Sequence, residues 1–125
     1  MIKTITTAQV RNICEDLLPN WETERKNIQV SGRDMYSIIK IKKELEKKLG
    51  EIQETVTTLA EQSGGERQDN GSYKIPPEKI EDLNNELAAF SDEEVEIEYT
   101  PIKIKNDDIL PPVLMDCLFD FIEME

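Results

Sequence analysis

The segment from Met35 to Leu59 constrains the fold most, because its apolar residues recur with alternating spacings of three and four from Leu45 onward. This spacing is typical of a coiled-coil-like seam along one face of a helix. Lys42 stands where the pattern calls for an apolar residue, and Ser31-Gly-Arg-Asp34 resembles a helix-capping signal. We therefore predict one long helix within residues 31–62. A helix of about 28 residues is roughly 40 Å long, so its seam must pack on another helix of this chain or of a neighbouring chain.

Residues 1–30 are predicted to form a short strand followed by a helix. Ile2 to Ile5 fits the strand, and Thr6 or Thr7 supplies a helix N-cap. Pro19-Asn20 is expected to end this helix, and Trp21 to Val30 shows no clear pattern. Before the proline, apolar residues recur on one helical face; they are Val10, Ile13, Cys14, Leu17 and Leu18.

Residues 63–72 form the clearest loop of the chain. They contain glycine pairs and the dipeptide Asn70-Gly71, which is typical of a tight hairpin turn. Ser72 to Ile75 is expected to be extended. Pro76-Pro77 then predicts the start of a helix, because proline suits the first helical turn. That helix is expected to end at Ser91-Asp92.

The C-terminal part predicts a strand and a last helix. Residues 94–99 alternate between glutamates and apolar side chains, which is the pattern of a half-buried strand. The Ile-Lys-Ile run at 102–104 extends the expected sheet beyond Pro101, which places that proline at an edge or a bulge. Pro111-Pro112 introduces a terminal helix, whose expected apolar face includes Phe121 and Ile122.

Together these elements predict a single α+β domain over residues 1–125, dominated by helices. We expect one long coiled-coil-like helix and a small antiparallel sheet of two or three strands. The expected parts are an N-terminal strand and helix (1–30), the long helix (31–62), the loop (63–72) and an acidic half (73–125). A chain of 125 residues has the length of one domain with a modest core.

The net charge of −12 is carried by the C-terminal half. Residues 1–61 hold ten basic and ten acidic side chains, whereas residues 62–125 hold five and seventeen. A negative field of this size repels nucleic-acid phosphate and anionic lipid, so we expect no direct binding to either. The charge suits a basic protein partner, and it also fits a simple role in solubility.

The cysteines and the N-terminus indicate an intracellular setting. Cys14 and Cys117 lie far apart among apolar neighbours, and we predict reduced, buried thiols. The first residues lack the basic region and the apolar run of a signal peptide. The sequence contains no stretch near the ~18 apolar residues that span a bilayer. We expect a protein that stays inside a cell or is assembled there, without a membrane partner.

The residues that usually perform catalysis are scarce in this chain. It has no histidine, which is the commonest general base and a common metal ligand. Glu94, Glu96 and Glu98 would lie about 7 Å apart along one strand face, too wide for one small cation. A solvated strand face is the better interpretation, and Asp107-Asp108 is interpreted as a helix cap. We predict no catalytic residue, no cofactor and no metal; a metal-dependent enzyme is the alternative that divalent-ion binding would reveal.

Two sets of residues form the candidate interaction surface. The first lies on the apolar stripe of the long helix, and the second is the row of glutamates on the acidic strand. The stripe can bind another chain or build the core of this one, and the pattern fits both. Exposed glutamates on a strand likewise fit a protected sheet edge or a binding strip. The candidates are Ile38, Leu45, Leu49 and Ile52 on the helix and Glu94, Glu96 and Glu98 on the strand.

A characteristic order of motifs runs through residues 35–123. A Lys/Glu-rich helix precedes a G-x-Y-x-I run and a second helix; an acidic strand, a Pro-Ile step and an acidic ending follow. The matching segments are Glu44 to Glu61, Gly71 to Ile75, Leu83-Asn-Asn-Glu-Leu87, Glu94 to Glu98, Pro101-Ile102 and Asp107 to Glu123. In this order the chain resembles a widespread group of small, acidic, uncharacterised proteins of tailed bacteriophages.

This resemblance implies a phage protein, located in the virion or in the host cytoplasm. We expect a non-enzymatic virion component that contacts capsid, portal or tail proteins, or copies of itself. The alternative is an acidic early phage protein that inhibits a host nucleic-acid enzyme or a defence system by binding its basic surface. An inhibitor of this kind presents carboxylates in place of DNA phosphates and usually carries them over much of its surface. Residues 1–61 are neutral here, which favours the virion role. The resemblance assigns no functional residue.

Overall fold

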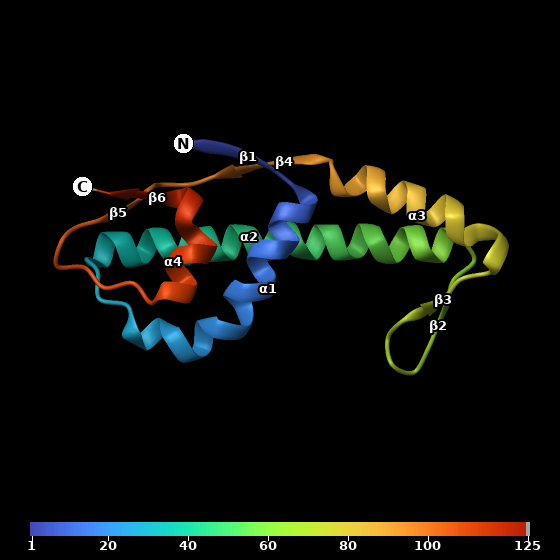
Figure 1. Ribbon diagram of the computed structural model, residues 1–125, viewed down its shortest axis with the longest axis horizontal. Helices are drawn as coiled ribbons and strands as arrows, with labels where there is room; N and C mark the ends of the chain where they lie inside the picture. Colours follow the sequence, from blue (N-terminus) through green and yellow to red (C-terminus); the bar gives the residue numbers. More distant parts are fainter. Residues whose placement is uncertain (125) are drawn as a thin grey trace.

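Helix α2 (Gly32–Gln62) runs along most of the molecule, and the other elements pack along it (Figure 1). The structure is a computed structural model that describes residues 1–124. Ser31 caps the helix, because its hydroxyl oxygen accepts a hydrogen bond from the Asp34 amide at 3.2 Å. The prediction of one long helix is confirmed.

Strand β1 (Ile2–Thr6) leads directly into helix α1 (Thr7–Glu24). A capping box joins them. The Thr6 hydroxyl accepts from the Gln9 amide at 3.2 Å, and the Gln9 side chain accepts from the Thr6 amide at 2.8 Å. The predicted N-terminal strand and helix are therefore both present.

The expectation that Pro19-Asn20 ends α1 is wrong, because the helix continues past both residues. Pro19 removes one backbone donor, but it is exposed, as is Glu15, whose carbonyl would have accepted that bond. Water can therefore reach the freed carbonyl. Leu17 and Trp21 are buried on either side of the proline and hold this turn against the core.

A small hairpin and helix α3 follow the long helix. Strands β2 (Glu66–Arg67) and β3 (Tyr73–Lys74) pair antiparallel, so the expected loop includes one strand of a hairpin. Its turn holds Asn70-Gly71, as predicted, and Gly71 has a φ of +85°, a conformation that favours glycine. Helix α3 (Pro77–Ser91) begins at the predicted proline and returns along α2 (Figure 1).

Three two-stranded sheets replace the single sheet that was expected. Strand β4 (Glu94–Glu98) pairs antiparallel with β1, and β5 (Ile102–Ile104) pairs with β6 (Ile122–Met124) in parallel. Pro101 separates β4 from β5, since it has no N–H to offer a ladder. The helix-dominated α+β class is confirmed, but the parallel pair was not predicted.

The terminal helix α4 (Pro112–Leu118) is shorter than expected. The chain passes through a 3₁₀ turn at Phe119–Phe121 and then enters β6, so Ile122 lies on a strand rather than on the helix. Helices α1 and α4 cover one half of α2, and the core lies between them (Figure 1). Its most deeply buried side chains are Val10, Leu17, Ile38, Ile41, Leu45, Ile97, Ile102, Leu114, Leu118 and Phe121.

The other half of α2 extends beyond this core. There it is accompanied by α3 and the β2–β3 hairpin, and Figure 1 shows neither α1 nor α4 beside it. We call residues 53–91 the distal arm, and the remainder of the described chain the body. Ala60 and Leu83 are the buried apolar residues of the distal arm, each 8% exposed. The fold therefore joins a well-packed body to a thin two-helix arm.

Candidate interaction surface

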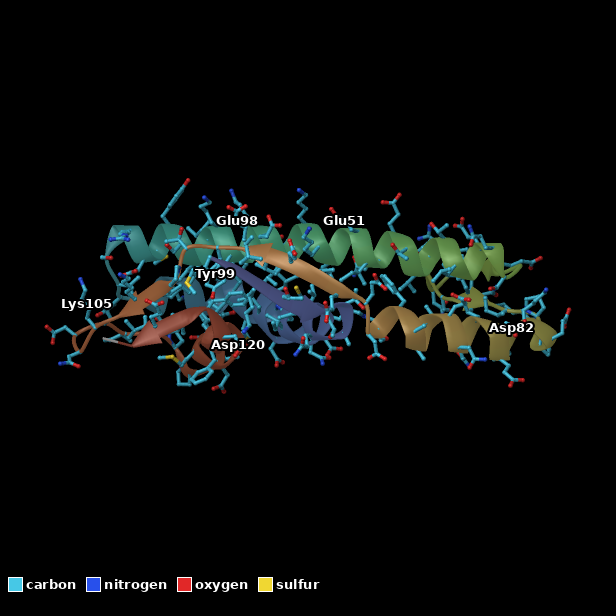
Figure 2. The ribbon with its side chains drawn as sticks, turned by 90° about the horizontal axis from the view of Figure 1, so that it is seen from above. Glu51, Asp82, Glu98, Tyr99, Lys105 and Asp120 are labelled. Atoms are coloured by element: carbon cyan, nitrogen blue, oxygen red, sulfur yellow. The ribbon has the colours of Figure 1, made fainter. Side chains whose placement is uncertain are left out.

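Acidic side chains gather in residues 49–98, which we call the acidic segment. It holds three basic and fourteen acidic side chains, a net charge of −11, whereas the rest of the chain holds twelve and thirteen. Figure 2 shows acids on three elements of this segment: Glu51 on α2, Asp82 on α3 and Glu98 on β4. The fold therefore concentrates nearly all of the net charge on the distal arm, on β4 and on the residues that flank them.

The apolar stripe of the long helix packs against the core at all four candidate positions, and three of them are buried. Ile38 and Leu45 are fully buried and Ile52 is 3% exposed, whereas Leu49 is partly buried against the core. Of the two interpretations of the stripe, the structure therefore supports the core for these three residues. They are not part of the accessible surface, and the seam packs within the chain.

Lys42 occupies the apolar position of the seam because it contacts two side chains at once. Its ammonium lies 5.4 Å from the centroid of the Trp21 ring and forms an ion pair with Glu46 on the next turn. The Lys42 side chain is 17% exposed, so these two contacts hold a charged side chain in a largely covered position. The sequence pattern accounted for neither Lys42 nor Trp21, and their contact gives a structural reason for both.

The three candidate glutamates lie on the exposed face of β4. Glu94 and Glu98 stand opposite Thr6 and Ile2 of β1, and Glu96 lies between them. All three are exposed, and none of them takes part in an ion pair in the described part of the chain. Three ion pairs are present there: Arg25–Glu22, Lys42–Glu46 and Lys48–Glu44. The row of charges on β4 is therefore free to meet another molecule.

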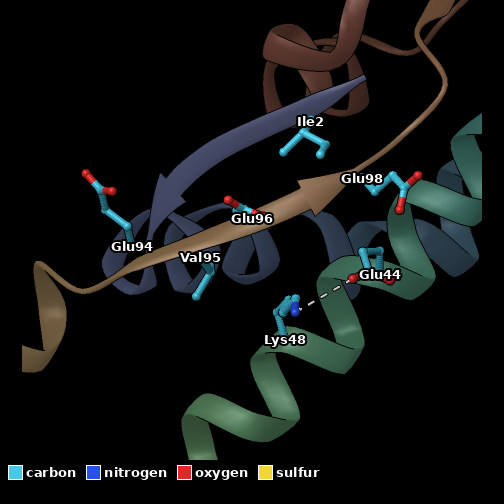
Figure 3. A pocket seen from close by; sticks show the side chains of 7 residues that line it. All are labelled: Ile2, Glu44, Lys48, Glu94, Val95, Glu96 and Glu98. Atoms are coloured by element: carbon cyan, nitrogen blue, oxygen red, sulfur yellow. Dashed lines mark ion pairs between the residues drawn. The ribbon is translucent and has the colours of Figure 1, made fainter.

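A groove of about 480 Å³ separates β4 from the outer face of α2 (Figure 3). From α2 it receives Glu44 and Lys48, whose charged atoms lie 3.9 Å apart. A second groove of about 530 Å³ continues past Glu98 toward Lys40 and Lys47. Sequence reasoning found the acids of the strand but missed the helix residues, because nothing in the sequence shows which helix face lies beside β4. The first groove is lined by Ile2, Glu44, Lys48, Glu94, Val95, Glu96 and Glu98.

A buried carboxylate, Asp34, ties the start of α2 to the C-terminal sheets. It is 4% exposed; one oxygen accepts from the Lys103 amide of β5 at 3.1 Å and the other from the Ser31 hydroxyl at 2.8 Å. The capping signal located this residue in sequence. Its second partner is 69 positions away, so local sequence could not reveal that the carboxylate also holds β5.

Both cysteines are free thiols. Cys14 is buried; burial, together with smaller effects of Glu46 and Cys117, raises the pKa of its thiol to about 11. Cys117 is partly exposed; burial also raises the pKa of its thiol, and Asp16 adds to the effect. A raised pKa keeps a thiol protonated and unreactive at neutral pH. Neither cysteine therefore has the electrostatic surroundings of a nucleophile.

Residues 1–124 contain neither a metal-binding cluster nor a membrane-spanning helix. No group of three or more Cys, Asp or Glu side chains in this range has the geometry to hold a metal ion. None of the described helices is both long enough and apolar enough to cross a membrane. The surface features that stand out are therefore the distal arm, the row of glutamates and the groove beside it.

Comparisons with known proteins add no relative. A scan against models of protein families, a search of curated proteins and a search of solved structures each return no match for this chain. The likeness to tailed-phage proteins stays a prediction from the order of sequence motifs. Conclusions about function therefore rest on the geometry of this chain itself.

Proposed function

We propose that this protein is a non-enzymatic bacteriophage protein, built into the virion, that binds a capsid, portal or tail protein through its distal arm. The phage setting is supported by the order of motifs in residues 35–123. The use of the arm is supported by its geometry: two helices project beyond the core with little apolar burial of their own.

The surface of the distal arm carries the observation on which this proposal rests. Ile80 is 44% exposed, and Leu59 and Leu87 are partly buried. A partner that lies along the arm would cover these side chains, and burying apolar area is the main source of affinity in protein association. Acidic residues border the same helices, which favours a basic partner surface.

Mass spectrometry of purified phage particles tests the proposal directly. We expect the protein at a fixed ratio to the major capsid protein. Ile80→Asp, which alters the arm without reaching the core, should lower its incorporation. Asp120→Lys, an exposed change on the body at the position labelled in Figure 2, serves as the control and should leave incorporation unchanged. Absence of the protein from particles would contradict the virion role.

The concentration of charge supports a second candidate, an early phage protein that inhibits a host nucleic-acid enzyme or a defence system. The acidic segment presents a net charge of −11 on the narrow arm, on β4 and on the residues that flank them, and a basic groove could enclose this surface. Carboxylates in such a groove replace the phosphates of nucleic acid. The neutral first half of the sequence would then serve as the support.

Affinity capture from host lysate distinguishes this second candidate. We expect the wild-type protein to retain a nucleic-acid enzyme or a defence protein, and the variant Glu81→Gln/Asp82→Asn/Glu86→Gln, which removes three negative charges from α3, to retain less of it. Added nucleic acid should release the same protein, because both compete for one basic surface. If no protein of this kind is retained, the inhibitor role is excluded.

A further inference from the structure

We infer that the free edge of β4 binds an extended, basic segment of the partner protein by antiparallel strand addition. The segment would become a third strand beside β4 and occupy the groove over α2. This inference rests on the proposed contact function and names the chemistry of one partner segment. It depends on three features of the molecule: an open backbone edge, a groove beside it and a matching row of charges.

The backbone of β4 is paired on one side. Tyr99, which directly follows the strand, exchanges two hydrogen bonds with Met1, each 2.9 Å long. Hydrogen-bonded and non-hydrogen-bonded residue pairs alternate in an antiparallel ladder. The backbone N–H and C=O groups of Val95 and Ile97 therefore also point toward β1. The N–H and C=O groups of the intervening glutamates then point to the opposite side. In the described structure that side of β4 pairs with no other strand, so it is an edge that another strand can use.

Space for a strand lies beside this edge. Figure 3 shows β4 between β1 and α2, with the groove on the side of the free edge. The groove opens toward Glu94, where the chain turns away to α3. An added strand lies about 4.8 Å from its neighbour, and the approximately 480 Å³ of the groove suits a short extended segment.

The glutamates of β4 determine which kind of segment fits this edge. Successive glutamates of β4 lie about 7 Å apart on one face, and an added strand repeats its own side chains at the same interval. Lysine or arginine at alternate positions would therefore meet each glutamate in a cross-strand pair. Glu44 adds a further carboxylate on the helix side, partly offset by Lys48. The segment that fits best is extended, with basic and small apolar residues in alternation.

A second copy of this chain does not fit the same edge. Pairing two β4 strands would place glutamates directly opposite glutamates, and like charges in cross-strand pairs are destabilising. The glutamates thus protect the edge from self-association while leaving it open to a basic strand. This explains why an unpaired edge persists on the surface.

A peptide series tests strand addition. The probe is a peptide of about six residues in which lysine and valine alternate; its partner peptide has the same composition with the lysines grouped. We expect the alternating peptide to bind at low salt, with slowed hydrogen exchange at the amides of Glu94, Glu96 and Glu98. The grouped peptide should bind at least about tenfold more weakly. It has the same total charge, but its lysines cannot each stand opposite a glutamate of β4.

Backbone methylation separates strand addition from simple charge attraction. In the antiparallel arrangement, residues opposite the glutamates point their N–H groups at β4. Methylating the lysine amides should therefore abolish binding, whereas methylating the valine amides should leave it intact. Equal binding of all the peptides, or loss on valine methylation alone, overturns the inference, as does the absence of any binding.

Two charge variants complete the test. The triple variant Glu94→Gln/Glu96→Gln/Glu98→Gln should bind the alternating peptide at least about tenfold more weakly than the wild type. The matched variant on α3, Glu81→Gln/Asp82→Asn/Glu86→Gln, removes the same number of charges and should bind normally. Circular dichroism confirms that both remain folded. If particles incorporate the β4 variant normally while Ile80→Asp is excluded, the contact function stands and strand addition at β4 fails.

Discussion

The body and the distal arm share one helix but are stabilised in different ways. In the body, α1, α4 and the sheets cover α2, and side chains such as Leu17 and Leu45 are fully buried. In the arm, α3 and the β2–β3 hairpin accompany α2, and the buried apolar residues there are Ala60 and Leu83. The acidic charge is concentrated in the arm and β4.

This difference shows how one long helix can serve two purposes. Its first half supplies the seam of a core, which holds the fold together. Its second half carries a thin helix pair with little apolar burial, for which we expect a lower local stability, and segments of low stability commonly supply binding surfaces. The boundary between the two lies close to Ile52, the last residue of α2 within the core cluster.

The largest expected difference concerns core leucines. Leu45→Ala in the body should lower the free energy of unfolding by about 3–5 kcal/mol, because the fully enclosed site cannot collapse. Leu83→Ala in the arm should cost about 2 kcal/mol or less, since a two-helix site near solvent relaxes more readily. Urea denaturation followed by circular dichroism measures both. Equal losses would show that the arm is packed as firmly as the body.

A second, smaller effect concerns the alkaline stability of the body. The pKa of Cys14 is raised above 9.0 in the folded state, so its stabilising contribution is present below pH 9 and is lost as pH rises through about 11. The stability difference between the wild type and Cys14→Ala should therefore shrink by roughly 2 kcal/mol over this range. Denaturation at successive pH values measures it. A constant difference would mean that the thiol titrates normally.

A third effect concerns the link between α2 and β5. Asp34→Ala removes the acceptor of the Lys103 amide and of the Ser31 hydroxyl, and should cost about 1–3 kcal/mol. Asp34→Asn retains one carbonyl acceptor and should cost less. Hydrogen exchange should speed up at Lys103 and leave the amides of α3 unchanged. Faster exchange in α3 as well would show that body and arm unfold as one unit.

The smallest effect concerns salt. The acidic segment repels itself, so salt should screen this repulsion and protect the arm slightly, by less than about 1 kcal/mol. The body outside the segment is nearly neutral and should change less. Hydrogen exchange of α3 amides at low and high salt gives the comparison. If the body responds more than the arm, the charge does not set the stability of the arm.

The elements themselves could be predicted largely from local sequence. The seam from Met35 to Leu59, the Asn70-Gly71 turn and the alternating strand at 94–98 each follow from short-range spacing and backbone preference. Pro19 misled the prediction, because the local cost of a proline was outweighed by burial of the residues around it. Strand β6 was missed because its pairing partner lies about twenty residues away.

The candidate site divides in the same way. The sequence by itself determined that Glu94, Glu96 and Glu98 share one exposed strand face, since alternation in a strand is a property of the backbone. It also determined the apolar seam, but not whether the seam would be covered from within. Only the tertiary structure decided that Ile38, Leu45 and Ile52 are core and that β4 has an open edge over α2. Both outcomes depend on which distant segments pack together, and that choice is made by the burial of the whole chain rather than by any local pattern.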